Sequence, residues 1–343
     1  MRRRTLLAAT GLAAAAGCAP SPPAPTVPAA TVSTGNGVVV APVRQAAMLT
    51  AYDVTATDLP ATLSALEQGL AGSAATIGVG ASLFDGRFTG LTKPRLLIDM
   101  PAFRADVLDP QWCHGDLLVQ VVGDDTAALR RLAGAPVAGL RRRWRIEGFH
   151  PAGLGQGVRN LFGFREGTAN PDAADRDLMS RLVWVQPGDG EPAWCAGGTY
   201  QVVRLIRMAL PTWDSDPVAD QERVIGRRRD NGAPLSGDRL DDEPDLAGDR
   251  IAVDAHIRLA NPRTPEAMAH RILRHGYSYR LPSAASGVDD AGQIFICYQR
   301  DVELGFAAIQ RRLAGEAMEK YLLPFGGGYY FVLPPAGAAA LIG

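Results

Sequence analysis

The chain has 343 residues, 47% of them hydrophobic, which is enough to bury one large core or two ordinary ones. Its formal net charge of −1 and its pI near 6.5 give no electrostatic basis for binding nucleic acid. The charge is nevertheless uneven, because residues 1–44 contain four arginines and no acidic residue. This asymmetry indicates an N-terminal segment with a separate role.

Residues 1–18 have the pattern of an export signal. Three arginines at 2–4 precede an apolar stretch at 5–17 that is too short for a stable bilayer anchor. The run RRTLL at 3–7 resembles a twin-arginine signal, and Cys18 follows Ala-Ala-Gly, a lipobox-like sequence that lacks the usual first Leu. We therefore predict export by the twin-arginine pathway to the cell envelope. Lipidation of Cys18, the one membrane contact that we expect, and ordinary cleavage nearby both stay open.

The next segment, residues 19–44, is rich in Pro, Ala, Ser, Thr and Val and is predicted to be an extended linker. The cysteines beyond it, Cys113, Cys195 and Cys297, have no CxxC spacing, so neither a zinc site nor a disulfide framework is indicated. We expect buried free thiols, with one disulfide among the three as the alternative.

The rest of the chain mixes strand-like and helix-like segments. Runs rich in Val, Ile, Tyr and Phe predict strands at 47–54, 76–83, 117–123, 200–208, 293–299 and 329–333. Helices are predicted at 59–70, 126–133, 265–275 and 302–314. The mixture favours an α+β fold with antiparallel sheets, in an N-terminal domain at 45–190 and a C-terminal domain at 191–343.

Common catalytic motifs are missing from the sequence. The five histidines form no HExxH pair, and no GxSxG elbow, P-loop or GxGxxG fingerprint is present. Metalloproteases, serine hydrolases and dinucleotide-binding enzymes are thereby disfavoured.

Two segments do indicate a site. The first, Gly163–Pro171, holds Glu166 between glycines, where the backbone can take unusual dihedrals and approach a flat ligand. The second, Asp254–Arg263, holds His256 and leads into the predicted helix that carries Arg274. Each signal is weak alone, because a single His near a helix start is usually structural and a Glu in a Gly turn is usually solvated.

Taken together, these segments resemble the dye-decolorising peroxidase family, and in particular its exported branch associated with iron uptake. The resemblance extends from about Ala47 to Pro335. The matching stretches are Ser82–Asp85, Gly163–Pro171, Gly198–Arg204, Asp254–Arg263, Ile272–Tyr279, Cys297–Asp301 and Phe325–Tyr329.

The resemblance implies two ferredoxin-like domains with haem b in the cleft between them. It implies a peroxidase that reduces H2O2 and oxidises bulky phenols or dyes through a high-valent ferryl intermediate. A haem- or iron-handling protein of a ferrous-iron uptake system, with an iron donor and uptake partner proteins, is the alternative, and a homo-oligomer stays open. A haem-free structural lipoprotein is disfavoured, because nothing would then explain why the chain contains both segments.

The family's site residues can be assigned to positions in this chain. The resemblance places the iron ligand on His256, with Asp301 as the candidate acceptor for its other ring nitrogen, and the catalytic pair on Glu166 and Arg274. A carboxylate can shuttle the proton during peroxide cleavage while a cation stabilises the developing charge. The family has Asp where this chain has Glu166, and a misplacement of about 1 Å can cost on the order of 100-fold in rate.

Further residues are expected to contact the haem. They are Gly167, Thr168 and Ala169 beside Glu166, Asn261, Pro262 and Arg263 after His256, and Arg227 and Arg258 as propionate partners. Donors too large for a buried site would need a Tyr or Trp relay, for which the candidates are Trp112, Trp184, Trp194 and Trp213.

Overall fold

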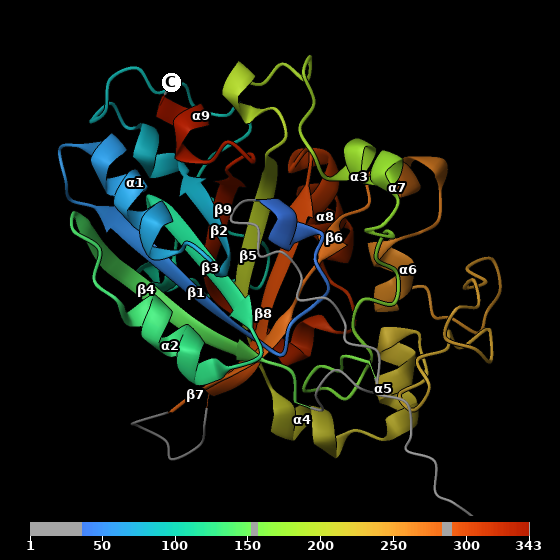
Figure 1. Cartoon of the computed structure of the whole chain (residues 1–343). Coiled ribbons are helices and arrows are strands. Elements are labelled where there is room, and N and C mark those ends of the chain that lie inside the picture. The colour runs from blue at the N-terminus through green and yellow to red at the C-terminus, as the bar shows by residue number, and fades with distance from the viewer. Residues whose placement is uncertain (1–35, 152–156, 283–289, 343) are drawn as a thin grey trace, which may run out of the picture. The chain divides into compact units, whose positions relative to one another are not determined.

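The computed structural model describes residues 36–151, 157–282 and 290–342 (Figure 1). The predicted signal at 1–18, with Cys18, and most of the linker at 19–44 lie outside these residues. The last residues of that linker include a short 3-10 helix, Asn36–Val39, whose two valines are buried. Within the described ranges no helix combines the length and the apolar character needed to cross a bilayer.

The first half of the fold is a four-stranded sheet with two helices. Its elements are β1 (Ala46–Val54), α1 (Leu59–Gly69), β2 (Ala74–Gly80), β3 (Leu117–Gly123), α2 (Thr126–Gly134) and β4 (Leu140–Phe149). β1 pairs antiparallel with both β3 and β4, and β2 pairs antiparallel with β3. The strand order β4-β1-β3-β2 in a βαββαβ chain is the ferredoxin-like arrangement.

The second half repeats this arrangement with a longer first crossover. Its elements are β5 (Thr199–Met208), α4 (Leu210–Ser215), α5 (Val218–Ile225), α6 (His256–Ala260), α7 (Pro265–Ala269), β6 (Leu273–Arg274), β7 (Tyr277–Leu281), β8 (Asp290–Gln299), α8 (Ala308–Leu313) and β9 (Leu322–Val332). β5 pairs antiparallel with both β8 and β9, and β7 pairs with β8. The order β9-β5-β8-β7 is therefore ferredoxin-like as well, and the fold predicted from the resemblance is confirmed.

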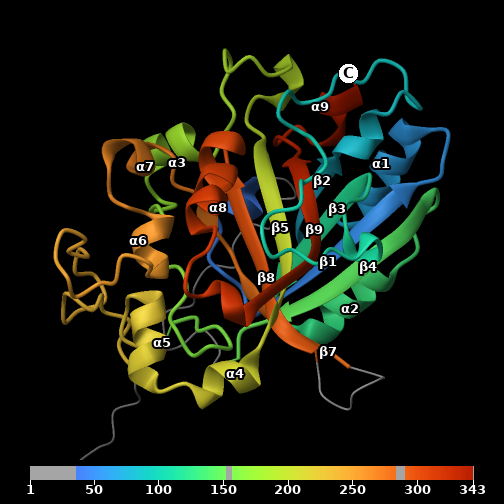
Figure 2. The ribbon, with the colours of Figure 1, turned by 180° about the vertical axis from the view of Figure 1, so that it is seen from behind.

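The two sheets join at both edges. β2 pairs with β9, and β4 meets β7 through the single pair Phe149 and Ser278, so that the strands close into a ring. In Figures 1 and 2, α5, α6 and α7 stand together beside the second sheet, away from α1 and α2. The remaining helices are α3 (Arg176–Leu182), α9 (Ala338–Ile342), a π-helical turn at Glu303–Ala307 and 3-10 turns at Ala81–Phe84, Pro110–Trp112, Ala193–Cys195 and Glu319–Tyr321.

Local signals explain the helices that the sequence predicted correctly. α1 and α2 start at Asp58 and Asp125, whose carboxylates accept hydrogen bonds from first-turn amides, a cap that contributes about 1 kcal/mol. α1 buries Leu59, Leu63 and Leu66 on one face, at the spacing of an amphipathic helix. Cys113, Cys195 and Cys297 are buried free thiols, as expected.

One predicted helix is wrong in its second half. The segment 265–275 forms a helix only as far as Ala269, and Arg274 lies in the short strand β6, where Leu273 and Arg274 pair with Tyr298 and Cys297 of β8. The Thr264 cap and Pro265 at the first turn are present as predicted. Pairing with β8 and burial of Leu273 outweigh the local helical preference, which is a weak determinant. The change matters because a strand directs Arg274 differently from a helix.

Two histidines lie beside the strands of the second sheet, His150 buried next to β7 and His275 half-buried next to β8. The His150 ring stacks on Tyr277 with 4.5 Å between ring centroids, and its Nε2 makes no hydrogen bond within the described residues. Burial lowers the pKa of His150 to about 4. Burial, followed by the charge of His150, lowers the pKa of His275 to about 4 as well. Both rings are therefore neutral in the folded protein near neutral pH.

We expect the protein to lose stability as the pH falls from about 6.5 towards 4. Above about pH 6.5 these histidines are neutral in both states and contribute nothing. Below it, the unfolded chain takes up protons that the folded chain refuses, which costs up to about 1.4 kcal/mol per pH unit for each ring. Urea unfolding at pH 7.5 and pH 5 measures the loss. His150→Phe keeps the stacking and removes one titrating group, so an equal loss in this variant would contradict the assignment.

Candidate active site

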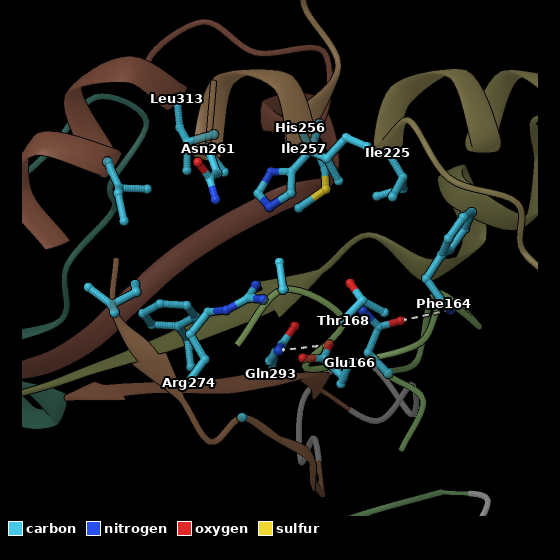
Figure 3. A pocket seen from close by; sticks show the side chains of 18 of the residues that line it. Phe164, Glu166, Thr168, Ile225, His256, Ile257, Asn261, Arg274, Gln293 and Leu313 are labelled. Atoms are coloured by element: carbon cyan, nitrogen blue, oxygen red, sulfur yellow. Dashed lines mark hydrogen bonds between the residues drawn. The ribbon is translucent and has the colours of Figure 1, made fainter. Parts of the chain in front are cut away.

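A cavity lies between the segment 160–169 and the helices that cover the second sheet (Figure 3). It encloses about 1700 Å³ of space, open solvent at its mouth included. Its walls are largely apolar and include Phe162, Phe164, Ile206, Ile225, Ile257, Ile272, Phe295, Phe306, Ile309, Leu313, Met318 and Leu322. Polar groups are concentrated on two opposite walls and at one end. A flat apolar ligand with a few polar points would fit such a lining.

His256 supplies the polar group of the first wall. It is the first residue of α6, and Arg312 of α8 donates to the carbonyls of Leu259 and Ala260 at the other end of this short helix. The His256 Nδ1 lies 2.7 Å from Oε2 of Glu316, which is 8% exposed. An ionised carboxylate can only accept, so Nδ1 donates, and in the neutral ring, the form that can bind a metal, Nε2 carries the lone pair. The side chain is 23% exposed, and Figure 3 shows its ring facing across the cavity.

The electrostatics of His256 follow from this pair. Burial disfavours the charged ring, but the charge of Glu316 and its hydrogen bond outweigh burial, so the pKa of His256 is raised. The prediction that Asp301 accepts from His256 is wrong. Asp301 instead accepts from the backbone amides of Glu303 and Leu304, both at 2.9 Å, at the start of the π-helical turn.

Glu166, Gln293 and Arg274 lie on the opposite wall, as Figure 3 shows. Gly163 and Gly167 both have positive φ, at 85° and 71°, so the glycines around Glu166 provide the unusual dihedrals that the sequence predicted. Nε2 of Gln293 donates to Oε1 of Glu166 at 3.1 Å. The Glu166 loop and the Arg274 strand thus lie together on one wall of the cavity, and the His256 ring faces them from the other wall.

Asn170 ties the Glu166 loop to the strand that carries Arg274. Its Nδ2 donates to the Arg274 carbonyl at 2.8 Å, and its Oδ1 accepts from the Arg274 amide at 3.2 Å. This double hydrogen bond fixes the register of two segments that are 104 residues apart. The final Asn-Pro of the first motif therefore holds the two catalytic candidates in relation to each other.

One end of the cavity is cationic. Arg227, Arg263 and Arg271 all line it, and within the described residues the Nε atoms of Arg227 and Arg271 are buried without a hydrogen-bond partner. Burial, and then the charges of Arg263 and Arg274, lower the pKa of Arg227 to about 10. Arg263 has φ +62°, a strained value for a non-glycine residue, and its Nε donates to the exposed Glu243 at 2.6 Å. This end is suited to an anionic group.

The structure brings most of the predicted site residues to this one cavity. Those that line it are Glu166, Gly167, Thr168, Ala169, Arg227, His256, Asn261, Arg263 and Arg274. Arg258 and Pro262 are not among its lining residues, and Arg258 donates to the carbonyls of Gly248 and Ile251. Sequence reasoning missed Glu316, Gln293 and Arg271, which lie far along the chain from the motifs or carry no motif signal. Within the described ranges no three His, Cys, Asp or Glu side chains gather into a metal-binding group.

Comparison with known proteins agrees with this geometry. Residues 36–150 match the family model for the N-terminal part of Dyp-type peroxidases, and residues 157–337 match the model for the C-terminal part. Deferrochelatase of Escherichia coli K12 is 46% identical over 274 residues, which cover 76% of this chain and 64% of that protein. The match thus spans less than two thirds of that relative's length.

Solved structures show the same likeness. Ferric DtpA of Streptomyces lividans superposes with a TM-score of 0.79 at 32% identity, over 90% of this chain and 94% of that one. A DyP-type peroxidase of Streptomyces coelicolor gives 0.78 at 32% identity, over 91% and 95%. With both family models matched in order, and the site segments within them, the chain belongs to the Dyp-type peroxidase family.

Proposed function

We propose that the protein is a haem b peroxidase that reduces H2O2 and oxidises organic donors. The observation that carries the proposal is the cavity in which the His256 imidazole, hydrogen-bonded to a carboxylate, faces Arg274 and Glu166. Family membership supports it, as do the ferric and oxyferrous forms of DtpA among the similar structures.

The residues present fit a haem. His256 offers a single Nε2 lone pair, the ligand type of peroxidases and globins. Apolar side chains such as Ile257 and Phe295 would contact the ring. Arg227 and Arg271, whose Nε atoms are buried without a hydrogen-bond partner among the described residues, would meet its carboxylates. When bound, the haem supplies the iron and the electrons with which H2O2 is reduced to water.

On the His256 wall, Glu316 has two functions. Its hydrogen bond fixes the ring tautomer and orientation, and its charge makes the ring a better electron donor. Such a partner favours cleavage of the O–O bond over simple binding of oxygen. The Arg312 contacts with the end of α6 keep the helix, and hence the ring, in place.

On the opposite wall, Glu166 and Arg274 would act on the peroxide itself. The Glu166 carboxylate can take a proton from one peroxide oxygen and pass it to the other, which then leaves as water. Arg274 can donate hydrogen bonds to the leaving oxygen and stabilise the negative charge that develops there. The two hydrogen bonds between Asn170 and the Arg274 backbone keep Glu166 and Arg274 in register during this transfer.

Haem titration followed by peroxide turnover tests the proposal. We expect the purified protein to bind haem with a sharp Soret band and to oxidise a phenol only when H2O2 is added. A chain that binds no haem, or binds it without any peroxide-dependent oxidation, would contradict the function. The full-length protein should be used, because most of residues 1–44 lie outside the described structure.

A second candidate function is haem or iron handling within a ferrous-iron uptake system. The name of the curated relatives, deferrochelatase at 46% identity, favours it. Release of iron from added haem, measured with a ferrous chelator alongside fluorescence of the metal-free porphyrin, distinguishes the two. Peroxide-dependent oxidation with the haem iron retained supports the peroxidase. Stoichiometric loss of iron supports the alternative.

Donors too large for the cavity would require a relay, and Trp213 is the candidate that contacts the cavity wall. Its ring stacks on Phe162 at 4.2 Å between centroids and meets Phe164 edge-on at 5.9 Å. Trp213 also meets the ring of Tyr321 edge-on at 4.8 Å between centroids, and the Tyr321 hydroxyl donates to Asp216. This aromatic series leads from the cavity wall towards the partly buried carboxylate of Asp216.

Trp213→Phe is therefore expected to reduce turnover of a bulky dye by roughly tenfold, which corresponds to about 1.4 kcal/mol of barrier. Turnover of a small phenol that enters the cavity should stay close to wild type, because it needs no relay. Steady-state rates with both donors measure the difference. Trp184→Phe is the matched control, since Trp184 is partly buried and, within the described residues, makes no aromatic contact with a side chain that lines the cavity, whereas Trp213 contacts Phe162 and Phe164. A selective dye defect in that control, with none in Trp213→Phe, would assign the relay elsewhere.

We infer from the sequence that the chain is exported by the twin-arginine pathway and reaches the cell envelope. The support is the RRTLL run at 3–7. Replacing both arginines of that run by lysine should retain the protein in the cytoplasm, as measured by fractionation. Fatty-acid labelling of wild type and Cys18→Ala decides between a lipid anchor and ordinary cleavage.

A further inference from the structure

We propose that Gln293 is a positioning residue that orients the Glu166 carboxylate, in a niche that Gly276 leaves open. The inference deepens the proposed function and rests on it for its catalytic consequence. It explains how a carboxylate on a side chain as long as that of glutamate is held in one position on the cavity wall.

The first step is the contact between the two side chains. Nε2 of Gln293 donates to Oε1 of Glu166 at 3.1 Å, across 127 residues of sequence, and Figure 3 shows the bond on the wall opposite His256. Gln293 lies on β8, and the other β8 side chain that lines the cavity is Phe295, two residues further along the same face. An amide thus occupies an otherwise apolar part of the strand and meets the carboxylate.

The second step is the space around this bond. A Cβ at Gly276 would lie 2.8 Å from the Gln293 amide nitrogen and 3.7 Å from Oε2 of Glu166. Gly276 is not among the glycines with positive φ, so its backbone does not require glycine. The absence of a side chain at 276 is what gives the Gln293 amide its room.

The third step concerns the length of the Glu166 side chain. Glutamate has one more rotatable bond than aspartate, so an untethered carboxylate would sample several positions along the wall. The Gln293 hydrogen bond holds one oxygen and leaves Oε2 for the substrate. A displacement of about 1 Å at a reacting group can cost on the order of 100-fold in rate, so the tether has kinetic weight.

The test compares Gln293→Leu in two backgrounds. In the wild-type background, kcat/KM for H2O2 should fall by roughly 10- to 100-fold, while KM for the organic donor stays the same. The Glu166→Asp background has a shorter side chain with one rotatable bond fewer. In that background Gln293→Leu should change kcat/KM by less than about twofold. Equal losses in both backgrounds, or none in either, would overturn the proposal. Gly276→Ala should reproduce the pattern because its Cβ displaces the amide.

A spectroscopic readout separates this proposal from the proposed function. The infrared carboxylate band of Glu166, identified by its loss in Glu166→Gln, should shift in Gln293→Leu with or without haem. If wild type shows no peroxidase activity, the proposed function fails, and the band still decides whether Gln293 holds Glu166. An unshifted band would refute the positioning role of Gln293 even in an active enzyme.

Discussion

His256→Ala is expected to abolish specific haem binding. His256 is the one imidazole that lines the cavity in the described structure, and it faces the space with its Nε2 lone pair because Nδ1 donates to Glu316. Loss of a residue that only supports a metal ligand typically costs 10- to 100-fold in affinity, so loss of the ligand itself should cost more than about 100-fold. A haem titration followed at the Soret band measures this, with Glu316→Gln expected in the smaller range.

The control for this experiment is His270→Ala. His270 lies at the end of α7 and lines a different hollow, together with Arg300 and Asp301, so its loss should leave the Soret titration unchanged. Added imidazole should restore the Soret band in His256→Ala, because the missing ring leaves a space of its own size. Wild-type affinity in His256→Ala would mean that another group holds the iron, and the site as a whole would have to be reassigned.

Much of the fold could be predicted because its signals are local. The strand at 117–123 and the helix starts after Asp58 and Asp125 follow from runs of β-branched residues and from capping side chains. Strand order is not local. The ferredoxin-like pairing depends on contacts such as that between Ala46 of β1 and Phe149 of β4, so it came from the family resemblance and then from the structure.

β4 shows where local reasoning fails. Its segment Leu140–Phe149 contains four arginines, and only Trp144, Ile146 and Gly148 alternate inward. The period-2 pattern is present but short, and the charged residues around it resemble a loop. The strand forms because it pairs with β1 along nearly its whole length. Tertiary pairing, rather than propensity, decides this element.

The site residues could be predicted where they lie within a sequence motif. His256 and Glu166 each lie in a recognisable segment, and the structure places both on one cavity. Glu316 was missed because it is 60 residues from its partner and lies outside every motif that the sequence offered. Gln293 was missed because one amide in an apolar strand has no meaning until the facing carboxylate is known.

The second large effect is expected for Arg274. Arg274→Leu should reduce kcat/KM for H2O2 by about 100- to 1000-fold, the usual cost of removing one donor that stabilises developing charge. Haem affinity should change little, because Arg274 lies on the wall opposite the ligand. Peroxide-dependent rates at saturating donor, alongside a Soret titration, measure both quantities. Leucine roughly keeps the volume of the aliphatic stem, so the loss reports charge and hydrogen bonding.

Arg274→Lys separates those two contributions. Lysine keeps the positive charge but lacks the planar fork of donors, so an intermediate loss is expected if both charge and directed hydrogen bonds act on the leaving oxygen. A lysine variant as slow as the leucine variant would assign the effect to geometry alone, and one as fast as wild type would assign it to charge alone. Near-wild-type rates in Arg274→Leu would refute its catalytic role. Glu166 would then have to carry peroxide cleavage, and its orientation by Gln293 would become the principal control of the rate.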